Sequence, residues 1–552
     1  MKSMSLSGLV VAVGIATSCA APALAGDTES VKQQIEALKK IIAQQQEKLD
    51  ELSAQVQDVK VSTVNQFADE RRIRNENPQL GLKNGRPTFE SSDGKFSAQI
   101  RALGQFDWGY YGQGASARSL PAAYGPDLSS GTNFRRVYLG VQGKVFGDWS
   151  YNFNYDFGGS GGTEAPGRIQ SVYLQYDGLK PFAIRAGAFP PPANIEDGTS
   201  AADTIFLERN APSDVQRNIA GGDGRDAISL MYGGDQLFAA MSYTGGKVQD
   251  TAVFDEQQAL VGRASYLFYS DEDTRFLVGV NGSWVFSLPD AVANGAPSLE
   301  TTPGATALHS FTLSNVPELT IDSNGIRLAN TGALPADAVR QWGGEAAGYW
   351  QGLYVQGGYY DFNVERSPVA YTVFSASGVS APRIVQPGDN RFNAWYVQAA
   401  WTLTGETRSY NAANGAFSLP KPAAPFSIDG SGWGAWEIAA RYSELNLNDR
   451  TSDPTSVITG WSGVNRTYTF YNTVRGGDQK ALSLALNWYA NENVRLGLQY
   501  QLIQLDRLQS GATPNTLTGI TATTSAAVVP AIPSLVADQD VQTLALRVQL
   551  GF

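Results

Sequence analysis

The chain has 552 residues, a formal net charge of −11, 58 glycines, one cysteine and one histidine. The excess negative charge disfavours a nucleic-acid-binding function. No run of about eighteen apolar residues follows the N-terminal segment, which excludes a helical membrane protein. A membrane β-barrel remains compatible, because strands that alternate apolar and polar residues average out to a soluble-looking composition.

Residues 1–25 are predicted to be a secretory signal peptide. Lys2 precedes an apolar stretch from Leu9 to Ala16, and Ala23–Leu24–Ala25 forms a small-residue cleavage site. Lipidation at Cys19 is the alternative, although the residues before Cys19 lack the usual leucine. Cleavage after Ala25 would leave a mature chain without cysteine, so no disulfide is expected in an oxidising compartment.

Residues 26–68 are predicted to form a periplasmic coiled-coil helix, since their apolar residues recur at heptad a and d positions. About four heptads are marginal in isolation, so this seam needs partner chains, whose number the core residues do not fix. A tether to the cell wall or to another periplasmic or surface protein is a further possibility. A single amphipathic helix on the barrel or membrane is the other interpretation. The seam residues are Ile35, Leu38, Ile42, Leu49, Leu52, Val56 and Val59, with Gln45 as the polar exception.

A polar connector is predicted for residues 69–94, which show no sustained periodicity. From residue 95 to 552 the pattern changes to strict alternation, and the first strand ends on the aromatic residues Trp108, Tyr110 and Tyr111, which suit a membrane interface. The last strand, which ends at Phe552, alternates apolar and polar residues in the same way. Short turns alternate with longer loops, as in outer-membrane barrels. The exception is Thr404–Gly432, a long connection on the rim where the turns are otherwise short.

Sixteen strands can be counted, which predicts an all-β fold: a 16-stranded antiparallel transmembrane β-barrel preceded by the helical coiled coil. A β-propeller would need a blade repeat, and none is visible. The predicted strands are 95–109, 133–146, 149–158, 168–177, 181–189, 225–232, 237–244, 259–269, 274–286, 341–350, 353–361, 392–403, 434–446, 479–490, 494–506 and 540–552.

Several stretches between about residues 84 and 552 resemble the phosphate-selective porin family of Gram-negative outer membranes, the O and P type porins. The resemblance implies a homotrimeric porin in outer-membrane lipid, whose third loop, here about 190–224, folds inward to narrow a channel for anions such as phosphate. The matching stretches are Asn84–Pro87, Asp93–Phe96, Arg135–Arg136, Leu139–Val141, Phe146–Trp149, Ile195–Glu196, Thr199–Ser200, Phe206–Arg209, Thr404–Glu406 and Gly434–Ser443.

Side chains alternate between the lipid face and the lumen face along each strand, and this alternation predicts which charges face the lumen. A cation on the lipid face near the midplane costs about 2–4 kcal/mol. Arg135 falls on the opposite face from Arg136 and is expected near an interface, where it can snorkel. The excess of basic over acidic wall residues favours anions. The predicted pore-lining cations are Arg101, Arg136, Lys144, Arg185, Arg263, Arg441, Arg495 and Arg547, against Asp107, Asp156, Glu345 and Glu437.

The third loop is expected to place both signs of charge at the constriction, through Glu196, Asp203, Glu208, Arg209 and Arg217. Its carboxylates leave a general or cation-preferring porin as an alternative, and the coiled coil leaves a structural envelope tether. An outer-membrane enzyme would usually need a histidine base, and His309 lies in the long low-complexity loop Leu288–Arg340. No catalytic activity, cofactor or metal is therefore expected.

Overall fold

The structure, a computed structural model, divides into two compact units, Met1–Asn77 and Pro78–Phe552. The predicted signal peptide and the first two residues of the predicted coiled coil lie outside the described residues. The structure describes residues 28–76, 78–83, 85–113, 128–159, 167–248, 250, 255–323, 325–375, 377–453, 455–462, 465–506, 508–509, 520–523, 535–536 and 539–552.

The first unit contains one long helix, α1 (Thr28–Glu76), which continues past the predicted end at residue 68. The apolar seam of α1 is uncovered in the single chain: Leu38 is 57% exposed, Leu52 57% and Val59 64%. Among the described residues, no helix combines the length and the apolar character needed to cross a membrane. An isolated helix with such a seam gains little from burial, so the seam is available to a partner.

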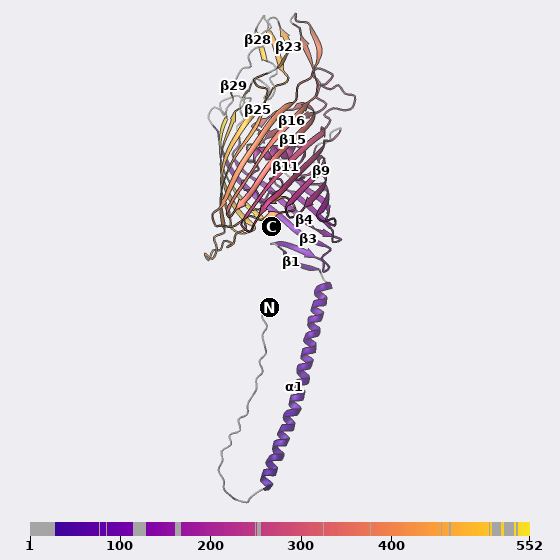
Figure 1. Ribbon diagram of the computed structural model, residues 1–552, viewed down its shortest axis with the longest axis vertical. Coiled ribbons are helices and arrows are strands. Elements are labelled where there is room, and N and C mark those ends of the chain that lie inside the picture. Colours follow the sequence, from indigo (N-terminus) through magenta and orange to yellow (C-terminus); the bar gives the residue numbers. More distant parts are fainter. Residues whose placement is uncertain are drawn as a thin grey trace. The chain divides into compact units, whose positions relative to one another are not determined.

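The second unit is a closed antiparallel β-barrel of sixteen strands, which confirms the predicted fold class (Figure 1). The last barrel strand pairs with both its predecessor and the first, and this pairing closes the wall. The barrel strands are β3 (Ser97–Gln113), β4 (Gly131–Val145), β5 (Trp149–Asp156), β6 (Arg168–Tyr176), β7 (Phe182–Ala188), β8 (Arg225–Gly233), β9 (Leu237–Lys247), β10 (Gln258–Ser270), β11 (Thr274–Ser287), β15 (Leu334–Trp350), β16 (Leu353–Arg366), β19 (Asn390–Thr402), β22 (Ala435–Asp449), β25 (Val474–Tyr489), β26 (Val494–Asp506) and β30 (Gln539–Gly551).

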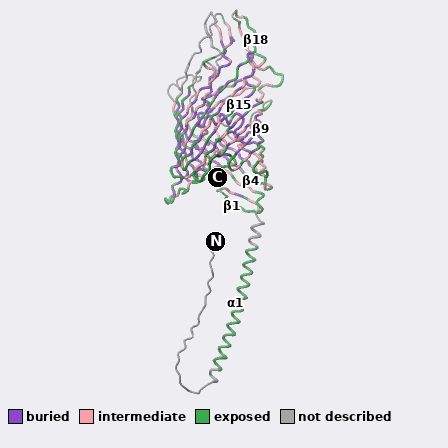
Figure 2. The backbone as a smooth tube through the Cα atoms, viewed as in Figure 1, coloured by how far each residue is buried: buried purple, intermediate pink, exposed green. Residues whose placement is uncertain are grey.

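Alternation along each strand separates an apolar outer face from a polar interior, as β30 illustrates. Leu546 and Val548 point outward and are exposed in the single chain, whereas Thr543, Ala545 and Arg547 are buried inside. The same alternation of buried and exposed residues recurs around the wall (Figure 2). The outer face therefore matches the hydrocarbon layer, and the polar groups of the chain collect within the barrel.

A hairpin precedes the barrel, inside the segment predicted to be an irregular connector. Strands β1 (Gln79–Lys83) and β2 (Arg86–Glu90) pair with each other, and β2 adds to β3 through Thr88 opposite Gln99. Gly85 supplies the positive φ of 74° that a two-residue hairpin turn requires. The Asn–Gly pair at 84–85 is the sequence signal for this turn, so the hairpin could have been predicted.

Shorter elements lie in the connections between barrel strands. These are β12 (Ser310–Phe311), β13 (Ser314–Asn315), β14 (Ala329–Asn330), β17 (Val369–Phe374), β18 (Ser380–Val385), β20 (Tyr410–Asn411), β21 (Ala416–Phe417), β23 (Ser456–Ser462), β24 (Asn465–Phe470), β27 (Leu508–Gln509), β28 (Ile520–Thr523) and β29 (Leu535–Val536). The helix α3 (Ala211–Ala220) belongs to the connection between β7 and β8.

Candidate functional site

The connection 189–224, called the third loop here, leaves the wall after β7 and crosses the interior. The backbone N–H of Leu207 donates to Gln499 on β26 at 2.9 Å, and that of Ile195 donates to Glu345 on β15 at 2.9 Å. Its helix α3 is capped by Asn210, whose side chain accepts from the N–H of Ser213. The third loop is thus attached to the wall opposite its own strands.

A second segment, residues 313–322, also lies inside the barrel and was not predicted to do so. The side chain of Tyr111 donates to the carbonyl of Leu319 at 2.9 Å, and Asn133 donates to that of Thr320 at 2.6 Å. Glu318 holds the segment to the far wall through Arg441 on β22, at 2.6 Å. The sequence here lacks periodicity, so long-range contacts place the segment in the lumen: these polar ones, and the packing of Leu319 and Ile321 in a buried apolar cluster with Tyr111.

The third insertion, residues 403–434, comes from the rim of short turns and explains the unusually long connection there. Arg263 on β10 donates to the carbonyls of Asn414 and Gly415, both at 2.7 Å. A Cβ on Gly415, which has a φ of +57°, would lie 2.8 Å from the Cβ of Phe238, so only glycine fits. Phe417 of this insertion shares a buried apolar cluster with Phe206 of the third loop. The interior is therefore narrowed from both rims.

Glu208 of the third loop is the centre of a buried ionic cluster. It forms a two-point ion pair with Arg135 at 2.6 and 3.0 Å, and it contacts Arg136 at 3.5 Å and Arg547 at 3.0 Å. Burial alone would raise the pKa of Glu208, but the three guanidinium groups hold it well below its usual range. The carboxylate therefore stays ionised and joins the loop to β4 and β30.

The placement of Arg135 near a membrane interface was wrong. Arg135 is only 5% exposed and lies in the lumen beside Arg136. The cause is a β-bulge: the register between β3 and β4 shifts between Gln105 and Phe106, so that one residue of β4 has no partner. The extra residue of a bulge interrupts the alternation of inward and outward side chains. Both arginines therefore point into the lumen and reach Glu208.

The other predicted wall arginines on β10 and β22 are neutralised in the same way. Arg263 pairs with Glu345 at 2.6 Å, and Arg441 pairs with Glu318 at 2.6 Å. Buried pairs of this kind barely stabilise a fold, but removal of one partner leaves an uncompensated charge that costs about 3–5 kcal/mol. Arg408, which sequence parity could not assign because it lies in the 403–434 insertion, pairs with Glu437 on β22.

The remaining predicted cations do not join these pairs. Arg495 is buried and donates to the carbonyls of Thr204 and Ile205 at 2.5 Å, so it holds the third loop. Half-buried Arg185 stacks on Tyr173, with 4.2 Å between the guanidinium carbon and the ring centroid. Lys144 is exposed at the end of β4.

The predicted third-loop residues divide into paired and unpaired groups. Arg217 bridges Asp197 and Asp223, both at 2.5 Å. Arg209 donates to the carbonyl of Glu196 at 3.2 Å, and the carboxylate of Glu196 accepts from the N–H of Asn210 at 3.3 Å. Asp203 faces a cavity on the short-turn side and forms no ion pair among the residues that the structure describes.

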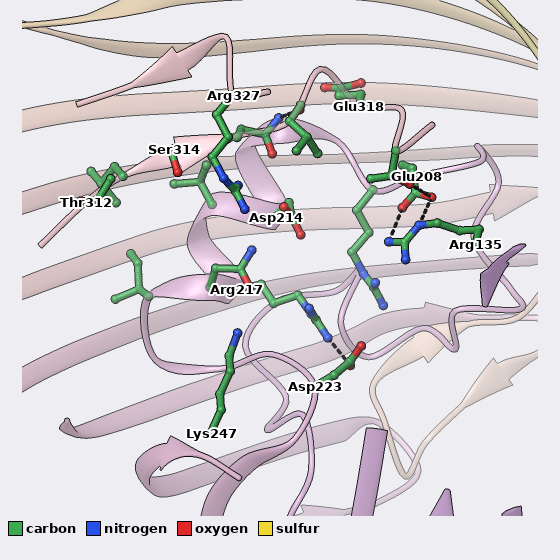
Figure 3. A pocket seen from close by; sticks show the side chains of 18 of the residues that line it. Arg135, Glu208, Asp214, Arg217, Asp223, Lys247, Thr312, Ser314, Glu318 and Arg327 are labelled. Atoms are coloured by element: carbon green, nitrogen blue, oxygen red, sulfur yellow. Dashed lines mark hydrogen bonds and ion pairs between the residues drawn. The ribbon is translucent and has the colours of Figure 1, made fainter. Parts of the chain in front are cut away.

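A cavity of about 390 Å³, called the outer chamber here, lies on the long-loop side of Glu208. Dashed contacts in Figure 3 join Arg135 to Glu208 and Arg217 to Asp223, whereas Lys247 has no ion pair within the described part of the chain. Cations outnumber carboxylates along the lining. The cations are Arg135, Arg136, Arg168, Arg209, Arg217, Lys247 and Arg327, and the carboxylates are Glu208, Asp214, Asp223 and Glu318.

A second cavity of about 540 Å³, called the inner chamber, lies on the short-turn side. The charged side chains that line it are Arg86, Arg101, Lys421, Arg495, Asp203 and Glu492. Between the two chambers, Arg136 donates to Gln105 at 2.9 Å and Gln105 donates to Gln549 at 2.7 Å. Gln549 in turn donates to the carbonyl of Ala202 at 3.0 Å. This polar layer and Glu208 separate the chambers.

Comparison with known proteins agrees with this architecture. Residues 115–523 match the family model described as phosphate-selective porin O and P. Porin O of Pseudomonas aeruginosa is 25% identical over 432 residues, which cover 76% of this chain and 85% of that protein. An uncharacterized protein of Caulobacter vibrioides is 25% identical over 445 residues, which cover 78% of this chain and 72% of that protein.

Solved structures also match the chain, at low identity. The outer membrane channel DcaP of Acinetobacter baumannii is 12% identical with a TM-score of 0.41, over 84% of this chain and 99% of that one. An anion-selective porin from Comamonas acidovorans is 11% identical with a TM-score of 0.40, over 83% of this chain and 100% of that one. With a closed sixteen-stranded wall, a polar interior and a family match over most of its length, the chain belongs to the phosphate-selective porin O and P family and is an outer-membrane channel protein.

Proposed function

We propose that the channel passes small anions, including phosphate, by passive diffusion. The observation that carries this proposal is the outer chamber, where seven cations face four carboxylates although the whole chain has a net charge of −11. Charges in a narrow, partly desolvated passage act more strongly than exposed charges, which salt screens beyond about 8–10 Å. Local charge at the constriction therefore outweighs the acidic surface.

The test is the reversal potential of single channels in a planar bilayer across a potassium chloride gradient. We expect the sign of the reversal potential to show that the natural protein prefers chloride to potassium. Lys247→Gln should lower the chloride-to-potassium permeability ratio by about twofold, since one cation with no carboxylate partner is lost from the outer chamber. Lys180→Gln, a matched change in an exposed short turn, should leave the ratio unchanged. A potassium-selective natural channel would contradict the proposal and favour a general porin.

We further propose that the protein is a homotrimer whose α1 helices pack along the exposed seam in the periplasm. Sedimentation in detergent should give three chains per particle, and a peptide of residues 27–62 should gain helicity as its concentration rises, because a seam of this length is marginal alone. Leu38→Glu in the peptide should abolish the gain, and Lys40→Glu, away from the seam, should not. Helicity that is independent of concentration would favour a single amphipathic helix.

A further inference from the structure

The 403–434 insertion also has a part outside the lumen, residues 426–433, called the rim turn here. Ile428 of the rim turn is 96% exposed, more than any other large apolar side chain in the described part of the chain, and Trp433 is 73% exposed. The part of the insertion that enters the lumen buries its apolar residues instead, as Phe417 does. The packing of the pore therefore does not explain the apolar side chains of the rim turn.

The rim turn is held in one conformation by its own hydrogen bonds. The N–H of Ser427 donates to the carbonyl of Gly432 at 3.1 Å. The carboxylate of Asp429 accepts from the Ser427 hydroxyl at 2.6 Å and from the N–H of Ser431 at 3.0 Å. A Cβ on Gly432 would clash with the carbonyl oxygen of Pro425, so only glycine fits there. These bonds pair polar groups that would be costly to move, unpaired, into a less polar environment.

The base of the rim turn packs on aromatic residues of the outer face of the barrel. The ring of Phe426 meets that of Trp488 on β25 edge to face at 5.2 Å, and Trp488 stacks on Trp436 of β22 at 5.8 Å. The indole N–H of Trp488 donates to the carbonyl of Trp433 at 2.9 Å. Trp401, near the end of β19, is also exposed on this rim. Because aromatic girdles mark the membrane interface and short turns face the periplasm, the rim turn is attached at the headgroups of the periplasmic leaflet.

One charged group accompanies the apolar side chains of the rim turn. The bonds from Ser427 and Ser431 lower the pKa of the exposed Asp429 carboxyl to about 2, so it is ionised at neutral pH. Both bonds end on Oδ1, and Oδ2 has no partner among the described residues. The rim turn contains no cation, and the nearby Lys421 is paired with Glu492 at 2.9 Å. Asp429 is therefore available to a cation from outside the chain.

We propose that the rim turn is a lipid-docking element, in which Ile428 and Trp433 enter the periplasmic leaflet and Asp429 binds the ammonium headgroup of an aminophospholipid. An ammonium offers N–H donors, which an ionised carboxylate accepts. A choline headgroup is also cationic but has no N–H donor. This site lies on the outside of the barrel, so it is independent of the ion preference of the channel.

The depth of the rim turn can be measured with a nitroxide label, because the mature chain is predicted to lack cysteine. The full protein carrying labelled Ile428→Cys is placed in vesicles of phosphatidylethanolamine and phosphatidylglycerol. Collisions of the label with oxygen, which concentrates in the membrane, should exceed those with a water-soluble nickel complex. Asp235→Cys, in an exposed short turn on the same rim, should give the opposite order.

A label on Ile428→Cys that collides mainly with the nickel complex would overturn the proposal. A label shielded from both probes would overturn it as well, because it would show that a protein surface, such as a second copy of the chain, covers the rim turn.

The headgroup preference is measured by fluorescence quenching with brominated lipids in mixtures of phosphatidylethanolamine and phosphatidylcholine. The signal is the difference between the natural protein and Trp433→Phe, which isolates the indole of the rim turn. We expect phosphatidylethanolamine to bind about threefold more strongly, as for one charge pair at an exposed site. Asp429→Asn should bring the ratio close to one, whereas Asp235→Asn should leave it unchanged. Equal binding to the natural protein, or a preference that survives Asp429→Asn, would contradict the role of Asp429.

Discussion

Glu208→Gln is expected to raise the chloride-to-potassium permeability ratio about fivefold, because it removes the one carboxylate that faces three guanidinium groups at the constriction. Glutamine keeps the size of the side chain, so the change is mainly one of charge. The measurement is the reversal potential across a salt gradient. Conductance at low salt should rise as well, since a more positive constriction concentrates chloride.

A second substitution distinguishes an effect of charge on the permeability ratio from an effect of loop displacement. The double variant Glu208→Gln with Arg136→Gln should return the ratio towards its natural value, because the net charge of the cluster is restored. Asp235→Asn, an equal charge change in an exposed short turn, should have no effect. The depressed pKa of Glu208 keeps it ionised from about pH 5 to about pH 8, so natural selectivity should be constant over that range. A ratio that falls in Glu208→Gln would show that the third loop has moved.

Shortening the loop that carries the 313–322 segment should enlarge the pore. Asn315 and Ala329 face each other in the β13–β14 pair, so an Asn–Gly turn can join them directly in place of residues 316–328. Without Glu318 and Thr320 in the lumen, single-channel conductance is expected to rise about twofold. The chloride preference should rise too, because Arg441 loses its carboxylate.

The control for this deletion is an equivalent change elsewhere on the same rim. In the β17–β18 hairpin, Phe374 faces Ser380, and an Asn–Gly turn can replace the residues between them. That hairpin lines neither chamber, so conductance should stay at the natural value. An unchanged conductance in the 316–328 deletion would mean that the third loop and the 403–434 insertion alone set the pore size.

The barrel could be predicted from the sequence because alternation is a local property. All sixteen predicted strands correspond to observed ones, and β26 was predicted with its observed bounds. The interior was harder to predict. The inward turn of Arg135 depends on a bulge, and residues 313–322 are held by partners more than a hundred residues away, such as Tyr111 and Arg441. Neither leaves a periodic trace in the sequence.

The ionic cluster at Glu208 has a consequence for assembly, because it spans the junction between the first and last barrel strands. Arg547 on β30 pairs with Asp107 on β3, both at 2.6 Å from nitrogen to oxygen, and the same guanidinium contacts Glu208. A chain whose terminal strands have not yet met lacks this cluster. The final strand pairing therefore brings Arg547 and Asp107 to Glu208 in the same step that closes the wall, so the ionic constriction is complete only in a sealed barrel.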